Sequence, residues 1–149
     1  MYCFGEAMAT QLLTIPGVPW EQRADLSSKK VRERLSPTAL RMFFRLIKYW
    51  KVRDEDARTL LGGVSNGTFY KWKQGCPTVL DQDRLIRISL LVGIFKALNI
   101  LYSADLADDW VQLPNTNPMF GGQTPLAYML KGQPAMMRVR QLLDSRRGG

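Results

Sequence analysis

The longest apolar stretch of the chain covers residues 85–102, where only five residues are not apolar. Spacing at 3.6 residues per turn arranges the apolar side chains in two stripes, so this helix is predicted to be buried on nearly all sides. One stripe comprises Leu85, Ile88, Leu91, Val92, Phe95, Leu98 and Leu101, and the other comprises Ile86, Leu90, Ile94 and Ala97.

A core helix fits this stretch better than a membrane span. Arg87 and Lys96 would lie near the middle of the bilayer, at a cost of about 2.5 kcal/mol or more each. Neighbouring helices would cover one stripe, and a second copy of the chain would cover the other. The pattern therefore predicts a homodimer through the central helix and no membrane insertion.

The first half of the chain is predicted to contain a helix that begins at Ser36 and Pro37, a pair typical of helix starts. Apolar residues follow at helical spacing, with basic residues on the opposite side. Before this point the chain is harder to interpret, because residues 21–35 are strongly charged and fit either a solvated helix or a mobile basic arm. We therefore divide off residues 1–35 as a basic N-terminal arm.

Two short helices with a glycine turn between them are expected next. Asp54 is predicted to cap the first, which ends at Gly62 and Gly63, and Ser65 is predicted to cap the second, over residues 66–74. This order is typical of a helix-turn-helix, which we assign to residues 36–80. A turn of this kind usually has a single glycine, so the second helix is expected to be tilted.

The second of these helices is predicted to place polar side chains in a major groove, because Phe69 and Trp72 point inward. Asparagine reads adenine edges, and lysine reaches guanine or a phosphate. A plain three-helix bundle with a hydrated basic surface is the alternative. The DNA-binding candidates are Ser65, Asn66, Thr68, Tyr70, Lys71 and Lys73.

Residues 81–149 form the remaining predicted region, built around the central helix. Residues 105–110 are expected to form a short helical turn, and residues 113–124 an irregular loop, since prolines, asparagines and glycines cluster there. Thr124 and Pro125 are typical of another helix start, and a last helix is expected over residues 134–145. No strand pattern occurs in the sequence, so the predicted fold class is all-α.

The formal net charge of +8 over 149 residues indicates an anionic partner, with nucleic acid first. Nine of the basic residues lie between residues 29 and 53, where Glu33 is the only acidic one. A basic surface that is merely hydrated is the alternative. The first residues lack the pattern of a signal peptide, so a cytoplasmic protein is expected.

Composition argues against an enzyme. The sequence has no histidine, the commonest general base and zinc ligand, and its two cysteines, Cys3 and Cys76, look like ordinary thiols. Asp105, Asp108 and Asp109 are expected to form a hydrated acidic cap and not a metal site. We predict no catalytic residue, no metal and no cofactor.

The motifs of the C-terminal region together resemble the toxin-binding domain of the Xre/MbcA/ParS-type antitoxins. Residues 60–72 are similar to the Xre-like helix-turn-helix of the same family, and the resemblance covers residues 35–149. The C-terminal motifs are Trp110, Pro114 and Asn115, Phe120 to Gly122, Thr124 to Leu126, Gly132, Leu142 to Asp144, and Arg146 to Gly149.

This resemblance implies an antitoxin of a type II toxin-antitoxin system that neutralises a RES-domain toxin, an enzyme that degrades NAD. It also implies a homodimer, a C-terminal domain that blocks the toxin's active site, and a helix-turn-helix that binds the operator DNA of its own operon. A free-standing helix-turn-helix repressor without a toxin partner is the alternative. An NAD-using enzyme would need a catalytic set that the sequence lacks.

Toxin-facing residues are expected in three places: the loop at residues 117–124, the outer side of the last helix, and the tail. The two terminal glycines and the free carboxylate would fit a narrow cationic pocket, and a frayed terminus is the alternative. Phe120 is also expected to serve the core. The candidates are Asn117, Phe120, Gly121, Gly122, Arg140, Arg146, Arg147, Gly148 and Gly149.

Overall fold

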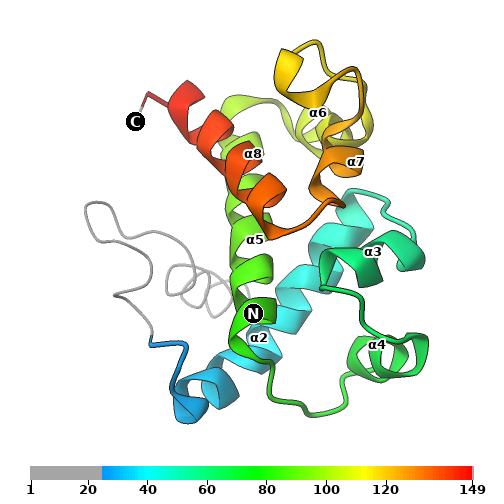
Figure 1. Ribbon diagram of the computed structural model, residues 1–149, viewed down its shortest axis with the longest axis vertical. Coiled ribbons are helices and arrows are strands. Elements are labelled where there is room, and N and C mark those ends of the chain that lie inside the picture. Colours follow the sequence, from blue (N-terminus) through cyan, green and yellow to red (C-terminus); the bar gives the residue numbers. More distant parts are fainter. Residues whose placement is uncertain (1–24, 149) are drawn as a thin grey trace.

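The computed structural model describes residues 25–148, in which helices are joined by turns and loops and no strand occurs (Figure 1). The predicted all-α class is therefore confirmed. Most of the predicted N-terminal arm, including Cys3, lies outside the described residues, as does Gly149. The elements are α2 (Lys29–Tyr49), α3 (Asp54–Leu60), α4 (Asn66–Lys73), α5 (Gln82–Leu101), α6 (Ala104–Asp109), η2 (Trp110–Gln112), η3 (Pro118–Phe120), α7 (Pro125–Met129) and α8 (Gln133–Arg146).

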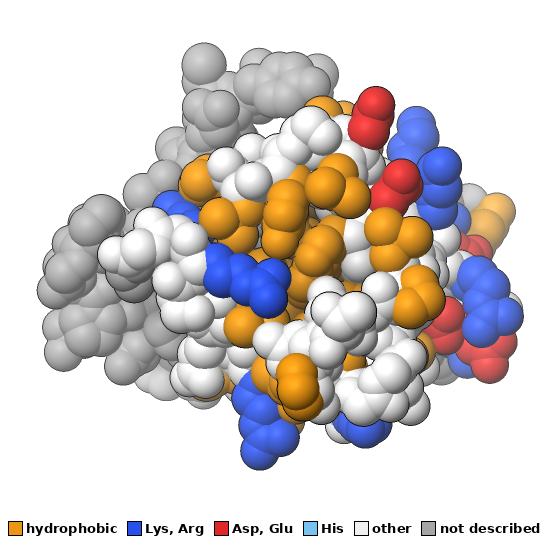
Figure 2. All heavy atoms as spheres, turned by 90° about the horizontal axis from the view of Figure 1, so that it is seen from above, with side chains coloured by type: hydrophobic (Ala, Val, Ile, Leu, Met, Phe, Trp, Pro, Cys, Tyr) orange, Lys and Arg blue, Asp and Glu red, His pale blue; other side chains and the backbone are white. Residues whose placement is uncertain are grey.

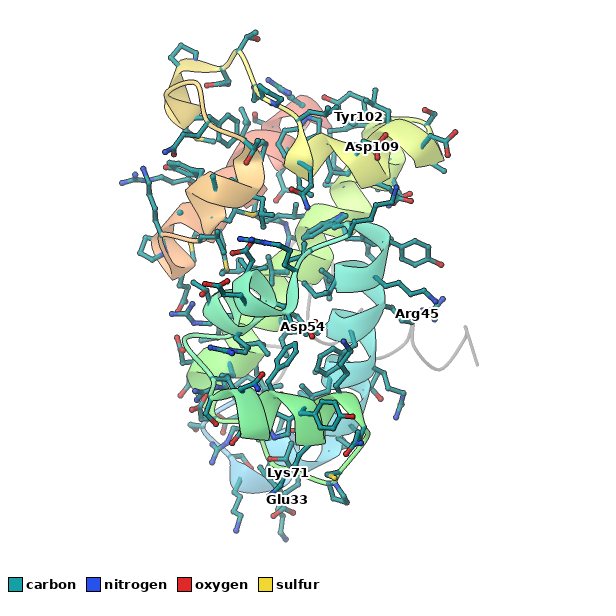
Figure 3. All side chains as sticks on the ribbon, turned by 90° about the vertical axis from the view of Figure 1, so that its right-hand side faces the viewer. Glu33, Arg45, Asp54, Lys71, Tyr102 and Asp109 are labelled. Carbon is teal, nitrogen blue, oxygen red and sulfur yellow. The ribbon has the colours of Figure 1, made fainter. Side chains whose placement is uncertain are left out.

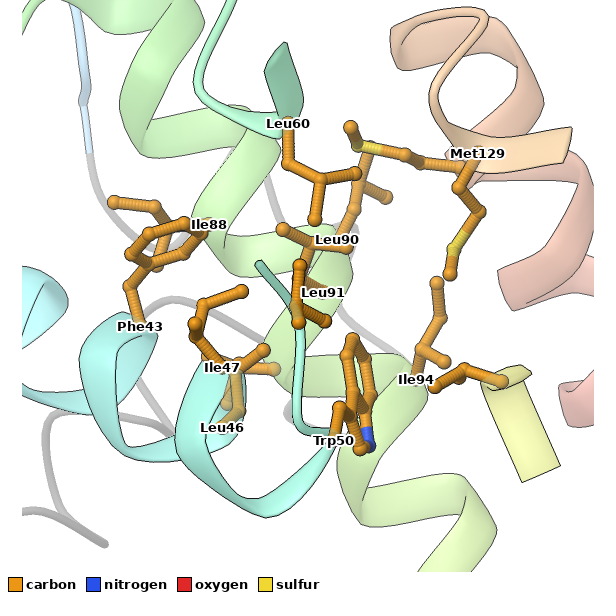
Figure 4. Close-up of a cluster of buried hydrophobic side chains, with 14 of the residues drawn as sticks. Phe43, Leu46, Ile47, Trp50, Leu60, Ile88, Leu90, Leu91, Ile94 and Met129 are labelled. Atoms are coloured by element: carbon orange, nitrogen blue, oxygen red, sulfur yellow. The ribbon is translucent and has the colours of Figure 1, made fainter. Parts of the chain in front are cut away.

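The predicted central helix is α5, and its N-terminus is capped by the Asp81 carboxylate, which accepts a hydrogen bond of 2.9 Å from the Arg84 amide. Helices α2 and α8 provide most of its contacts. In Figure 4, Ile88 and Leu91 lie on the side of α5 that faces α2, and Ile94 lies toward Met129 of α7. Two helical layers of the same chain therefore enclose α5.

Both apolar stripes of α5 are covered within one chain, so the expectation that a second copy covers one of them is wrong. Leu90, Ile94 and Ala97 of the second stripe are 7%, 0% and 0% exposed. The sequence pattern shows that two sides must be buried, but not what buries them. Here α8 folds back onto α5, with α7 packed against α8, and most of the second stripe is buried inside the chain.

The predicted helix start at Ser36 and Pro37 is also wrong. Helix α2 begins at Lys29, with Ser28 as its cap, and Pro37 lies inside the helix. The buried Ser36 hydroxyl donates to the Arg32 carbonyl at 2.6 Å and accepts from the Leu80 amide at 2.9 Å. These bonds and the surrounding burial hold the helix together at a proline that local sequence preference would place at its beginning.

The C-terminus of α2 is closed by Lys51, a residue other than glycine with a positive φ of 55°. The Val52 amide donates to the Ile47 carbonyl at 3.0 Å, which completes a Schellman motif. From η2, the Gln112 side-chain amide donates to the carbonyls of Trp50 and Lys51, at 3.1 Å each. The end of α2 is therefore attached to the C-terminal half of the molecule.

The short helices follow the predicted order. Asp54 is the first residue of α3 and Arg53 precedes it as the cap, so the predicted cap is one residue late. Gly62 and Gly63 have φ values of 91° and 87°, which explains why glycine is needed at this turn. Ser65 caps α4 as predicted, and its hydroxyl accepts from the Thr68 amide at 3.3 Å.

Candidate functional site

Helix α4 is held on the body of the protein by aromatic contacts. Phe69 is 2% exposed, and its ring centroid lies 5.3 Å from that of Phe44 on α2, in an edge-on arrangement. Trp72 is half-buried, and the Arg84 guanidinium lies 5.9 Å from its ring centroid. Both inward-pointing residues predicted for this helix thus face the core, and α4 is supported by α2 and by the first turn of α5.

All six DNA-binding candidates are exposed. The Ser65 hydroxyl is engaged as the helix cap, the Asn66 side chain accepts from Arg58 at 3.5 Å, and the Lys73 ammonium lies 3.2 Å from the Asp54 carboxylate. Tyr70 is 60% exposed. The structure therefore brings the six together on one short helix, with some of their polar groups already occupied by neighbours.

Two shallow cavities flank Trp72 beside this helix. One, of about 370 Å³, lies between α2 and α4 and combines aromatic walls with cations. The other, of about 340 Å³, lies between α4 and the start of α5. The first is lined by Leu40, Arg41, Phe44, Arg45, Trp72 and Lys73, among others. Together with exposed Lys71 (Figure 3), these cations give this end of the molecule a surface suited to phosphate groups.

The opposite end of the molecule contains the loop of residues 113–124, anchored by an aromatic cluster. The Phe120 ring lies 6.0 Å from that of Trp110 and 5.4 Å from that of Tyr128, edge-on to both. Phe120 is 1% exposed and therefore belongs to the core, which was expected of it in addition to a contact with the toxin. Gly121 and Gly122 are exposed at the surface of this loop.

Two polar residues shape the same region. The Asn117 side-chain oxygen accepts from the Met119 amide at 2.9 Å and caps η3. The Thr124 hydroxyl accepts from the Ala127 amide at 3.1 Å and caps α7, as predicted. Asn117 therefore has a structural task in the loop in addition to its proposed contact with a toxin.

Arg140 does not lie on the outer side of the last helix, which is the position expected from the sequence. Its side chain is 11% exposed, and its guanidinium donates to the Asp144 carboxylate at 3.1 Å. The guanidinium lies directly over Gly93 of α5, in space that a Cβ at Gly93 would occupy. A glycine inside the central helix thus makes room for an arginine of α8.

The tail candidates are largely part of helix α8. Arg146 is its last residue and donates to the Tyr102 hydroxyl at 3.4 Å, and Arg147 is the C-cap, 3.7 Å from the Asp144 carboxylate. Gly148 has a φ of 87°. The cations therefore lie against the end of α5 and α8, and only Gly148 extends the described chain past the cap.

The three aspartates of α6 lie on one short helix, with Asp105 and Asp109 exposed and Asp108 half-buried. Burial raises the pKa of Asp108, and the nearby charges of Asp109 and Asp105 raise it further. Over residues 25–148, no group of three or more His, Cys, Asp or Glu side chains is arranged to hold a metal ion. None of the helices in this range has the length and apolar character needed to cross a bilayer.

One set of exposed residues was not predicted. Ile100, Leu106 and Leu113 are 61%, 42% and 45% exposed, although all three are large and apolar. Figure 2 views the molecule from this end and shows apolar side chains gathered on it, with acidic and basic side chains at the margin and a basic side chain within the apolar area. Ile100 falls outside both stripes of the central helix, and this was the available signal that it faces solvent.

Comparison with known proteins gives two matches. Residues 96–149 match the family described as "Antitoxin Xre/MbcA/ParS C-terminal toxin-binding domain". The chain is also 41% identical over 115 residues to "Uncharacterized protein y4oB" of Sinorhizobium fredii (strain NBRC 101917 / NGR234), covering 76% of this chain and 87% of y4oB. No solved structure matches the chain. The chain therefore belongs to the same family as y4oB, and its residues 96–149 are similar to the toxin-binding domain of the Xre/MbcA/ParS antitoxins.

Proposed function

We propose that this antitoxin belongs to a type II toxin-antitoxin pair and acts by binding, not by catalysis. Its target is a RES-domain toxin that degrades NAD, and it neutralises the toxin in the cytoplasm by blocking the active site. The observation that carries the proposal is the match of residues 96–149 to a toxin-binding antitoxin domain. The resemblance of the sequence motifs supports the narrower assignment to a RES-type partner.

The arrangement of the candidate residues supports two separate binding ends. Lys71 lies at one end of the molecule, and Tyr102 lies at the other, beside Arg146 (Figure 3). Helix α5 spans the distance between these ends (Figure 1). A chain built this way can hold a toxin at its C-terminal end while α4 remains available to DNA.

The test for toxin binding is co-expression with the product of the neighbouring open reading frame. We expect the two proteins to co-purify and intracellular NAD to be preserved. Removal of residues 146–149 is expected to weaken neutralisation while leaving the helical content, measured by circular dichroism, almost unchanged. Continued NAD loss together with failure to co-purify would show that the proposal is wrong.

We further propose that α3 and α4 bind the operator of the protein's own operon and repress it. The basic surface beside α4 supports this role, because each phosphate neutralised by a cation contributes about −0.9 to the slope of log K against log salt. Lys71→Ala is expected to weaken binding and to make the slope of log K against log salt less negative by about 0.9, the contribution of one phosphate contact. Lys131→Ala, at the other end of the chain, is the control of equal charge.

A free-standing repressor without a toxin partner is the second candidate, and the exposed polar residues of α4 beside the basic side of α2 favour it. The two candidates differ in the adjacent gene, which encodes a RES-like enzyme only if the first is right. The proposed homodimer needs a contact surface other than the covered stripes of α5. Light scattering on the purified protein measures the oligomeric state.

A further inference from the structure

The cavity between α2 and α4 has an aromatic inner part that the proposed function does not use. Leu40 is 6% exposed, and Phe44 and Trp72 are half-buried, so these three side chains form the inner part. The volume of about 370 Å³ lies within the range of small-molecule sites. Contact with the backbone phosphates of a DNA duplex would not fill this part, because the bases of a duplex are stacked inside it.

Trp72 offers a ring surface to this cavity. It lines both cavities beside α4, whereas Arg84, whose guanidinium lies 5.9 Å from the ring centroid, lines only the second. The side of Trp72 that lines the cavity between α2 and α4 is therefore not occupied by that guanidinium. A planar ring in the cavity can stack on an aromatic side chain, and every nucleobase has a face suited to this contact.

Three exposed side chains, Arg41, Arg45 and Lys73, form a cationic rim around the aromatic part. Figure 3 shows Arg45 projecting outward from α2. Among the described residues that line the cavity, none is acidic. Arg41 also donates to the Thr38 hydroxyl at 2.8 Å, and Lys73 lies 3.2 Å from the Asp54 carboxylate. A guanidinium has five N–H donors and an ammonium has three, so neither contact uses all the donors of its side chain.

The two parts of the cavity together select one class of ligand. A phosphate monoester carries about −1.5 to −2 charges and three acceptor oxygens, which match three cations better than a single carboxylate does. The aromatic part requires a planar ring joined to that phosphate. We infer that the cavity between α2 and α4 binds a mononucleotide, with the base against Trp72 and the phosphate at the cationic rim. This site goes beyond the proposed function and does not depend on it.

The experiment is isothermal titration calorimetry of the full-length protein at low salt with adenosine monophosphate (AMP), adenosine and inorganic phosphate. AMP is expected to bind more tightly than either of its parts. Trp72→Ala is expected to weaken AMP binding roughly 10- to 100-fold, because the stacked ring is lost. Trp72→Phe keeps a ring and is expected to retain most of the affinity. Unfolding temperatures check that both variants fold.

The rim and the location of the ligand are tested separately. Arg45→Ala is expected to weaken AMP binding roughly 2- to 5-fold and to leave adenosine binding unchanged. Arg34→Ala is the matched control, because Arg34 is also exposed on α2 but lies roughly 16 Å from Arg45 along the helix axis. Cys76 is exposed and lines the cavity, so AMP is expected to slow its alkylation by iodoacetamide, as measured by peptide mass spectrometry.

Three results would overturn the inference. The first is an absence of AMP binding up to millimolar concentration. The second is equal affinity for AMP and inorganic phosphate, which would mean that the aromatic part contributes nothing and that the cations form a plain phosphate-binding surface. The third is AMP binding that Trp72→Ala and Arg45→Ala leave unchanged and that does not protect Cys76, which would place the nucleotide elsewhere on the protein.

Discussion

The two ends of this molecule are built on different principles. Helix α4 has eight residues, of which only Phe69 is buried, whereas four of the five residues of α7 are buried. At the α4 end, the proposed DNA contacts come from exposed side chains on a helix with one main anchor. At the C-terminal end, core residues shape the loop and the helices, and contacts are made from that framework. Substitutions should therefore separate binding from stability at α4 but not around α7.

The largest expected effect compares two buried phenylalanines. Phe120→Ala removes the ring between Trp110 and Tyr128 and is expected to cost about 3–5 kcal/mol. Phe69→Ala is expected to lower the free energy of unfolding by about 3 kcal/mol or less, because α4 lies at the edge of the fold and can detach locally. Urea unfolding measures both. A larger cost for Phe69→Ala would show that the α4 end is as integral to the core as the C-terminal end.

The contact between Gly93 and Arg140 gives the next largest effect. Gly93→Ala would place a methyl group where the Arg140 guanidinium lies, at an expected cost of about 1–3 kcal/mol. In the double variant with Arg140→Ala, the methyl group has space, and alanine favours the helix. A double-mutant cycle should therefore give a coupling of at least about 1 kcal/mol. Additive effects would mean that the arginine simply moves aside.

Ser36→Ala tests how the α4 end is joined to the body. The substitution removes the hydroxyl that accepts from the buried Leu80 amide. The unpaired amide is expected to lower the free energy of unfolding by about 1–3 kcal/mol. Because Leu80 follows α4 in sequence, hydrogen exchange should rise in residues 75–81 and in α4 before it rises in α7 and α8. Ser27→Ala, at an exposed serine just before α2, is the control. Equal exchange at both ends would contradict the difference between them.

The smallest effect concerns Asp108. Its pKa is raised in the folded protein, so the ionised form costs stability above that pKa, and the cost disappears as the pH falls and the carboxyl takes up its proton. Asp108→Asn should therefore stabilise the protein at pH 7, by at most about 0.5 kcal/mol. The difference from wild type should vanish near pH 3. A difference that grows on acidification would reverse the assigned sign.

Local chemistry explains what could be predicted from the sequence. Ser65, Asp81 and Thr124 each accept a hydrogen bond from the amide three residues ahead, and such caps can be recognised without knowledge of the fold. For the same reason the order of α3, α4, α5 and α7 follows from the sequence. The residues proposed to read DNA are exposed on α4, because helical periodicity assigns the inward side to Phe69 and Trp72.

What could not be predicted depends on residues far apart in the chain. Helix α2 passes through Pro37 because Ser36 bonds to Leu80, 44 positions later. The Arg140 side chain is largely buried because Gly93 of α5 has no side chain and leaves room for the guanidinium. The second stripe of α5 is covered by the chain itself, which periodicity cannot distinguish from cover by another copy. The pattern of apolar residues predicts which faces of a helix are buried. Which helix packs against each face depends on contacts between residues far apart in the chain.

The hydrogen bond from the Leu80 amide to Ser36 has a consequence for the orientation of α4. Phe69 fastens the helix to α2 directly, and Leu80 fastens the segment that leaves it to the same helix. The orientation of α4 therefore depends on these two attachments as well as on the two consecutive glycines of the preceding turn. Because both attachments lie outside that turn, we expect α4 to stay docked on α2 after cleavage of the backbone between Gly62 and Gly63.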